Sequence, residues 1–188
     1  VFTKIALAGN PLAVVLDSEG LSDQAMQSIA KEFNLSETVF LFPPKNPKNR
    51  AALRIFTPAT ELPFAGHPTV GTAVLFAMVD GQAHSSFGLE EQVGLVACTA
   101  SRISDCEGEA IFTLPRLPES IAEPASSSMI AAALGVSVDE IGFDHHCPLV
   151  ASAGVGFTYV PLKTKDTVTR AAIKSARSEE HTSELQSR

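Results

Sequence analysis

Residues 61–79 read ELPFAGHPTVGTAVLFAMV and are the most informative part of the sequence. From Pro68 to about Val79 the side chains are small or apolar almost all round. A helix without a polar face must be surrounded by protein, so this segment predicts a helix that runs through the middle of a domain. Pro68 suits the first helical position, because its missing N–H would have no partner within the helix.

Shorter elements are predicted before and after this helix. Ser22 is a candidate N-cap, and the apolar residues that follow it form one helical face that closes near Asn34. Continuous or alternating apolar residues predict the strands. These strands lie at Val1–Thr3, Leu12–Asp17, Glu37–Phe42, Leu53–Phe56, Ser86–Leu89, Val93–Cys98 and Ala110–Leu114.

The length of 188 residues predicts one or two domains. We expect a first domain at 1–118 and the start of a second at 119–176, joined by the proline-rich, linker-like Pro115–Pro124. The second part contains a predicted helix at Ser126–Leu134 ended by Gly135, a strand-rich segment at Leu149–Leu162, and a helix at Asp166–Ser175 with Asp166 as N-cap. Residues 177–188 break the apolar pattern and resemble a translated sequencing adaptor, so we exclude them from the fold.

Charge and composition exclude several classes of protein. The 14 Lys and Arg are scattered and outnumbered by 21 Asp and Glu, giving a net charge of −7, which disfavours nucleic acid as a partner. Asp80 interrupts the best apolar run, so no membrane-spanning helix is expected. Three cysteines without a CxxC pair are typical of reduced thiols, and we expect a cytoplasmic protein.

The first candidate functional residues are Gly66 and His67, at the predicted helix start. The free N–H groups and the positive end of the helix dipole favour an anion there, such as a substrate carboxylate. Gly66 lets another group approach the backbone closely. The alternative is that Gly-His-Pro is only an unusual cap, with His67 bonded to a neighbouring strand.

The second candidate is Glu37, at the beginning of a predicted apolar strand. A carboxylate that is partly shielded from water there is suited to take and return a proton. The alternative, which the residue alone favours, is a solvated glutamate on an edge strand.

Four motifs occur together in this chain: Gly9–Val14, Ser36–Phe40, Arg54–Pro58 and Glu61–Ala73. In this order and spacing they resemble the PhzF family of phenazine-biosynthesis isomerase-like proteins, which are related in fold to diaminopimelate epimerase. The resemblance covers about Val1–Ser175, with high specificity across Gly9–Ala73 and only a loose match after Pro118.

The resemblance implies an α+β fold of two similar domains, each a curved, mostly antiparallel sheet around a central helix, with the second domain truncated here. It implies a cofactor-independent isomerase of a small carboxylate-bearing metabolite, such as trans-2,3-dihydro-3-hydroxyanthranilate, with homodimers common in the family. Glu37 matches the catalytic glutamate and His67 the active-site histidine. Gly66, Ala65, Asn10 and Thr57 match positions expected to bind substrate or lie near it. The truncated chain itself is expected to have little activity.

Three alternatives remain open. The related epimerases and racemases use two cysteines, but Ala65 stands at the first of these positions, and the three cysteines of this chain lie outside every motif. A non-catalytic module could bind a carboxylate at the helix start. A metal enzyme centred on His145 and His146 would need further ligands, because adjacent residues in an extended segment point to opposite faces; no metal is expected.

Overall fold

The structure is a computed structural model that describes residues 1–5, 7–115, 117–153 and 155–173. The chain divides into two compact units, Val1–Leu117 and the residues from Pro118 on. Residues 177–188, predicted to be a foreign tail, lie outside the described residues. No helix in the described segments has the length and apolar character needed to cross a membrane.

The first unit is a mixed sheet with strand order β1-β2-β3-β5-β6-β7, and β4 pairs with β3. The pairs β1/β2 and β3/β5 are parallel, and the other pairs are antiparallel. The strands are β1 (Leu12–Val15), β2 (Glu37–Phe42), β3 (Ala51–Phe56), β4 (Glu61–Leu62), β5 (His84–Glu91), β6 (Gly94–Arg102) and β7 (Gly108–Thr113).

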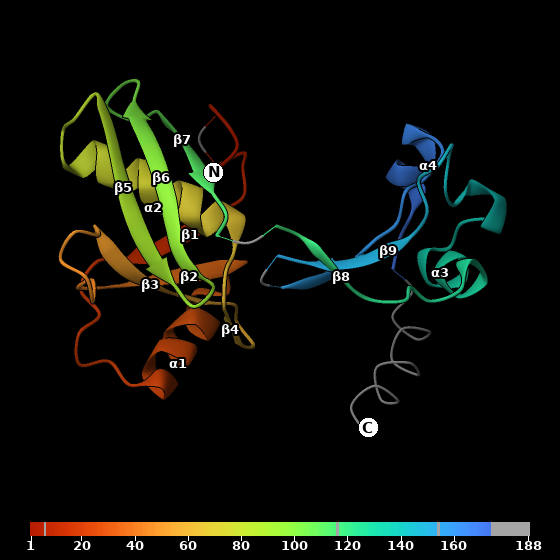
Figure 1. Ribbon diagram of the computed structural model, residues 1–188, viewed down its shortest axis with the longest axis horizontal. Coiled ribbons are helices and arrows are strands. Elements are labelled where there is room, and N and C mark those ends of the chain that lie inside the picture. Colours follow the sequence, from red (N-terminus) through yellow and green to blue (C-terminus); the bar gives the residue numbers. More distant parts are fainter. Residues whose placement is uncertain (6, 116, 154, 174–188) are drawn as a thin grey trace. The chain divides into compact units, whose positions relative to one another are not determined.

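Helix α2 (Gly66–Val79) is the centre of this unit. It contacts β1 and β2 at one end of the strand order and β6 and β7 at the other, so the sheet curls around it (Figure 1). Ala73 and Ala77 are fully buried in the main hydrophobic core. The predicted buried helix is therefore confirmed, but it begins two residues earlier, and Pro68 is its third residue. Proline is tolerated there because the first N–H groups of a helix have no partner within it.

Helix α1 (Asp23–Phe33) also has the predicted ends. The Ser22 side chain accepts a hydrogen bond from the backbone N–H of Ala25, and Asn34 adopts a left-handed conformation with φ 51°. The helix packs through Met26 and Ala30 on the second hydrophobic cluster of the unit.

The chain start differs from the prediction. Val1–Thr3 does not form a strand, because Phe2 has a φ of 62°, which breaks an extended conformation. One backbone pairing of a hairpin remains. The Val1 amino group donates to the Asn10 carbonyl at 2.8 Å, and the Asn10 N–H donates back at 3.1 Å.

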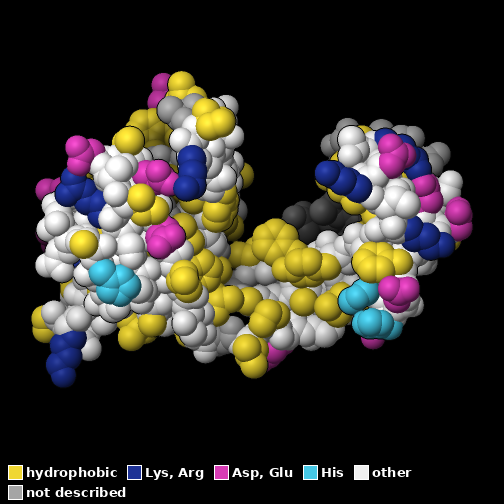
Figure 2. Space-filling view, turned by 90° about the horizontal axis from the view of Figure 1, so that it is seen from above, with side chains coloured by type: hydrophobic (Ala, Val, Ile, Leu, Met, Phe, Trp, Pro, Cys, Tyr) yellow, Lys and Arg dark blue, Asp and Glu magenta, His cyan; other side chains and the backbone are white. Residues whose placement is uncertain are grey.

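The second unit contains a three-stranded antiparallel sheet in the order β10-β9-β8. It comprises β8 (Glu119–Ala122), β9 (Leu149–Ser152) and β10 (Gly156–Tyr159), with helices α3 (Ser127–Leu134) and α4 (Lys165–Arg170) and a 3-10 turn at Val138–Glu140. Hydrophobic side chains lie at the surface of this sheet (Figure 2), including Ile121, Phe157 and Tyr159, each more than half exposed.

Two predictions in the second unit were wrong. The predicted linker Pro115–Pro124 contains strand β8, whose pairing with β9 overrides the local proline-rich composition. Helix α4 ends at Arg170 rather than Ser175, and its N-cap is Thr164, not Asp166. The Thr164 hydroxyl accepts the hydrogen bond from the Thr167 N–H. The α+β class is confirmed, while the expectation that the second unit repeats the first stays a prediction.

Candidate active site

The start of α2 presents backbone donors that no capping side chain uses. Its N-cap is Ala65, which has extended backbone angles and no side chain able to bond the first N–H groups. The first turn contains no acidic residue. These N–H groups and the positive end of the helix dipole therefore form a site suited to an anion.

Glu37 and His67 meet beside this helix start. Glu37 begins β2 and His67 is the second residue of α2, and the structure places Glu37 Oε2 3.1 Å from His67 Nε2. The side chains are only 17% and 9% exposed. The two atoms are not aligned for a hydrogen bond, and each is buried with no hydrogen-bond partner among the described residues. Two groups that can carry protons thus face each other with unused bonding capacity.

Asn10 orients the histidine from its other side. Its Nδ2 lies 3.3 Å from His67 Nδ1, and its Oδ1 accepts a hydrogen bond from the Ser36 hydroxyl at 3.2 Å. Because Asn10 Nδ2 donates in this arrangement, His67 Nδ1 accepts. A neutral His67 therefore carries its proton on Nε2, next to the Glu37 carboxylate.

Gly66 leaves open space at the helix start. A Cβ atom built on it would make one ordinary contact, 3.7 Å to the Phe112 ring, and its backbone is not in the left-handed region. By contrast, a Cβ on Gly71 would come within 2.5 Å of the Leu12 side chain. Neither packing nor backbone conformation among the described residues therefore calls for glycine at position 66.

Thr57 follows Phe56, the last residue of β3, which pairs with Thr38 of β2, so the backbone of Thr57 lies beside that of Glu37. Its hydroxyl accepts hydrogen bonds from the N–H groups of Ala59 and Thr60 and donates to the Thr60 carbonyl at 3.0 Å, within a turn. Its predicted role in substrate binding stays a prediction, as do the roles of Ala65 and Asn10. The structure gives Asn10 a use that we did not predict, namely contact with His67.

Sequence reasoning missed Ser36 as an individual residue, although it lies in a quoted motif, and it missed Glu91. Glu91 ends β5 and is 8% exposed, and its Oε1 lies 2.8 Å from the Thr69 hydroxyl in the first turn of α2. Burial raises the pKa of Glu91 to about 7, against a smaller lowering by the Thr69 hydrogen bond. The two-residue spacing from the buried Leu89 was the available signal, because alternate residues of a strand share a face.

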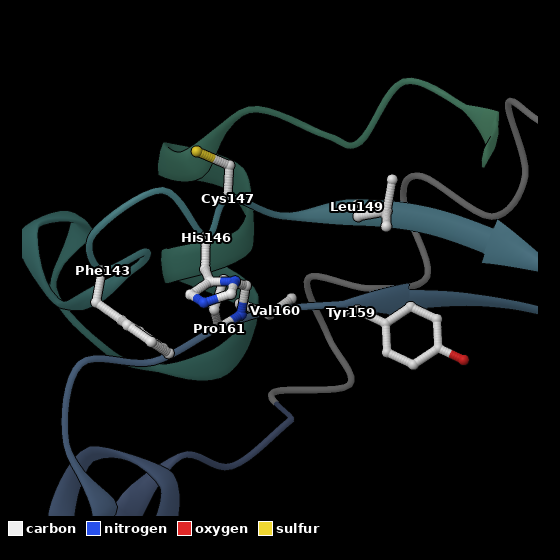
Figure 3. Close-up of a pocket in the computed structure, with 7 residues that line it drawn as sticks. All are labelled: Phe143, His146, Cys147, Leu149, Tyr159, Val160 and Pro161. Atoms are coloured by element: carbon white, nitrogen blue, oxygen red, sulfur yellow. The ribbon is translucent and has the colours of Figure 1, made fainter. Parts of the chain in front are cut away.

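A cavity of about 400 Å³ lies elsewhere, in the second unit (Figure 3). Its lining is mostly apolar and includes none of the predicted catalytic or substrate-binding residues, although it includes His146 of the alternative metal hypothesis. The Cys147 sulfur points away from the His146 ring (Figure 3). Across the described residues, no three His, Cys, Asp or Glu side chains are grouped so that they could hold a metal ion. The lining residues are Phe143, His146, Cys147, Leu149, Tyr159, Val160 and Pro161.

The fold matches solved structures of epimerases and of PhzF-family proteins. A Pseudomonas aeruginosa protein described as a predicted epimerase is 32% identical, with a TM-score of 0.79, over 92% of this chain and 60% of that one. A probable proline racemase from Agrobacterium radiobacter shares the fold at a TM-score of 0.50 and 16% identity, over 74% of this chain and 40% of that one.

The sequence comparison gives the family. The chain belongs to the PhzC-PhzF family of phenazine biosynthesis-like proteins, whose profile matches residues 1–186. It is 52% identical to an uncharacterized isomerase of Mesorhizobium japonicum, over 86% of this chain and 54% of the relative. It is 49% identical to the trans-2,3-dihydro-3-hydroxyanthranilate isomerase of Pseudomonas chlororaphis, over 54% of this chain and 35% of that enzyme. The chain thus spans about half the length of the Mesorhizobium japonicum relative and about a third of the length of the Pseudomonas chlororaphis enzyme.

Proposed function

We propose that the protein is an isomerase that moves a proton between two carbons of a small carboxylate-bearing metabolite, with Glu37 as the general acid and base. The observation that carries this proposal is the meeting of Glu37 Oε2 and His67 Nε2 at 3.1 Å, with both atoms buried and without a hydrogen-bond partner among the described residues. Membership of a family whose named relatives include isomerases supports the same reaction class.

The proposed reaction needs no net exchange of electrons with a cofactor. The Glu37 carboxylate takes a proton from one carbon of the substrate. The electron pair of that C–H bond forms a new double bond, and the neighbouring double bond of the substrate moves by one position. The protonated Glu37, whose side chain is 17% exposed, exchanges its proton with the solvent and then gives a proton to a second carbon. Substrate and product have the same composition. The absence of a cofactor stays a prediction.

His67 and the start of α2 have supporting roles in this proposal. The imidazole, held by Asn10 at Nδ1, keeps its Nε2 beside the Glu37 carboxylate. The substrate carboxylate binds the free N–H groups of the helix start, and Gly66 leaves it room. Such an arrangement keeps the reacting carbons beside Glu37.

The substrate and the complete site are also proposals. The first compound to test is trans-2,3-dihydro-3-hydroxyanthranilate, because a relative with 49% identity over 102 residues is named for its isomerisation. We further propose that residues beyond this chain complete the site, because the chain covers 54% of the Mesorhizobium japonicum relative. Because part of the proposed site lies beyond this chain, we expect the chain alone to have low activity.

The proposal is tested by incubating the compound in D2O with this chain and, side by side, with the full-length Mesorhizobium japonicum relative. An isomerase incorporates solvent deuterium at the carbon that receives the proton, and the relative is expected to be the faster of the two. Deuterium incorporation with inversion at a single centre would instead identify an epimerase. Binding of the compound by both proteins without product formation and without exchange would contradict catalysis and identify a carboxylate-binding module.

A further inference from the structure

The end of β5 places a second carboxylate behind the helix start. Glu91 is 8% exposed, and its Oε1 lies 2.8 Å from the Thr69 hydroxyl oxygen. That hydroxyl also lies 2.8 Å from the Ala65 carbonyl oxygen. The chain segment that follows Glu91 is tied to the segment that precedes α2, because the Val93 N–H donates to the Pro63 carbonyl at 3.3 Å.

The Thr69 hydroxyl cannot satisfy both oxygens with its single proton. If Glu91 is ionised, it and the Ala65 carbonyl compete for that proton. If Glu91 is protonated, it donates to the Thr69 oxygen, and the Thr69 hydroxyl donates to the Ala65 carbonyl. The two protons then make two hydrogen bonds, and no two oxygens compete for the same proton. The second Glu91 oxygen, Oε2, is buried and has no hydrogen-bond partner among the described residues, which further disfavours a charge there.

We propose that Glu91 is a positioning residue that, in its protonated form, holds the first turn of α2 through Thr69 and Ala65. This turn includes Gly66 and His67, so the inference rests on the proposed function and goes beyond it by adding a residue that does not touch the substrate. Ionisation of Glu91 withdraws the Thr69 proton from Ala65. It also places a negative charge near the helix end that receives the substrate carboxylate, and so weakens binding.

Few other titratable groups lie beside Glu91 among the described residues, so its titration can be followed separately. Burial raises the pKa of Glu91 to about 7. Cys98 on β6 is the neighbouring thiol, and burial, with a smaller contribution from the Glu91 charge, raises its pKa to about 12, so it stays protonated. The first turn of α2 contributes one titratable side chain, His67, whose ring contacts Glu37 and Asn10.

Glu91→Gln is the decisive variant, because an amide N–H can donate to Thr69 as a protonated carboxyl does but does not titrate. Glu90→Gln is the matched control. Glu90 is the preceding residue, and its carboxylate accepts from the Lys45 and Asn46 N–H groups and from Asn49, not from α2. Thr69→Val removes the connecting hydroxyl at nearly the same volume.

The test measures the KM for the isomerised substrate from pH 5.5 to 8.5 in the full-length protein that carries these residues. The KM of the wild type and of Glu90→Gln should rise about fivefold as the pH passes 7, the equivalent of one lost hydrogen bond. Glu91→Gln should keep the low-pH KM throughout. Thr69→Val should have the high KM at every pH. A rise in Glu91→Gln equal to that of the wild type would overturn the proposal.

A second readout does not depend on catalysis. In amide NMR spectra, the Gly66 and Thr69 signals should shift with a midpoint near pH 7 in the wild type and in Glu90→Gln. In Glu91→Gln the shift with this midpoint should be absent. If no compound is isomerised but this pattern is found, the proposed function fails while the role of Glu91 stands. Identical pH-dependent shifts in Glu91→Gln and the wild type would refute that role.

Discussion

Two carboxylates lie beside the first turn of α2 and differ in what they face. Glu37, at the beginning of β2, faces the imidazole of His67, a group that itself carries protons. Glu91, at the end of β5, faces the hydroxyl of Thr69, which does not titrate in the physiological range. The comparison indicates that burial alone does not identify a proton carrier. What the carboxylate faces distinguishes the two roles. Beside an imidazole it can exchange protons with a ligand, and beside a hydroxyl it supports the backbone.

The largest expected effect is on the Glu37 side. Glu37→Gln keeps the shape of the side chain but removes the proton carrier, so turnover should fall on the order of 10²–10⁴-fold. Steady-state product formation measures this. Glu32→Gln, on the exposed face of α1, is the matched control and should leave turnover unchanged. Unchanged turnover in Glu37→Gln would remove Glu37 from the mechanism.

The next effect is the pH dependence of stability that Glu91 introduces. Its pKa is raised from 4.5 to about 7 in the folded state, so the folded state holds the proton that the unfolded state loses. Wild-type stability therefore falls as the pH rises from about 4.5 to 7. Glu91→Gln should gain roughly 3 kcal/mol relative to the wild type between pH 4 and 8, measured by urea unfolding.

In the same urea unfolding measurement, Glu90→Gln should change the pH dependence of stability in the opposite direction. Hydrogen bonds from the Asn46 backbone, the Asn49 side chain and the Lys45 backbone lower the pKa of Glu90. The stability that its charge contributes is present above the unfolded pKa and is lost as the pH falls through the folded value. Relative to the wild type, Glu90→Gln should therefore lose stability at neutral pH and recover it in acid. The same pH trend in both variants would contradict the assignment of Glu91 as a protonated group.

A smaller effect separates the two glycines of α2. Gly71→Ala should lower the free energy of unfolding by about 1–3 kcal/mol, because the new Cβ meets Leu12 at 2.5 Å and Val1 at 2.9 Å. Gly66→Ala should change it by less than about 1 kcal/mol but weaken substrate binding. Thermal unfolding and a binding titration of both variants check this. Tight binding by Gly66→Ala would show that the space above residue 66 is not used.

The smallest effect concerns the orientation of His67. Asn10→Ala removes the donor at His67 Nδ1, which frees the ring to adopt the other tautomer. We expect a loss of about tenfold in kcat/KM, close to the upper end of what one hydrogen bond contributes. Nitrogen NMR of the His67 ring should show a mixed tautomer in the variant and a single one in the wild type. A single, unchanged tautomer in Asn10→Ala would show that Asn10 does not orient the ring.

Much of the first unit could be predicted from the sequence because its signals are local. The apolar α2, the Ser22 cap and the end of α1 near Asn34 each follow from a few neighbouring residues, and the structure confirms them. Strand β8 could not be predicted, because its formation depends on pairing with β9, about thirty residues away, and the segment around it, Pro115–Pro124, is proline-rich.

The candidate site shows the same division. Glu37 and His67 were found through motifs, but the contact between them depends on the curling of the sheet that brings β2 next to α2. The Asn10–Ser36 bond joins residues 26 positions apart, and Glu91 reaches Thr69 across 22. Such contacts follow from the tertiary fold, and alternation along β5 is the one local pattern that would have placed Glu91 inside.

The most direct measurement is the rate of solvent deuterium incorporation into the substrate at pH 6, with Glu37→Gln and Glu91→Gln side by side in the full-length protein that carries these residues. Both variants replace a buried carboxylate with an amide of the same shape. We expect Glu37→Gln to lose exchange by two or more orders of magnitude and Glu91→Gln to retain it. Equal rates in the two variants would contradict the division of roles between the two carboxylates.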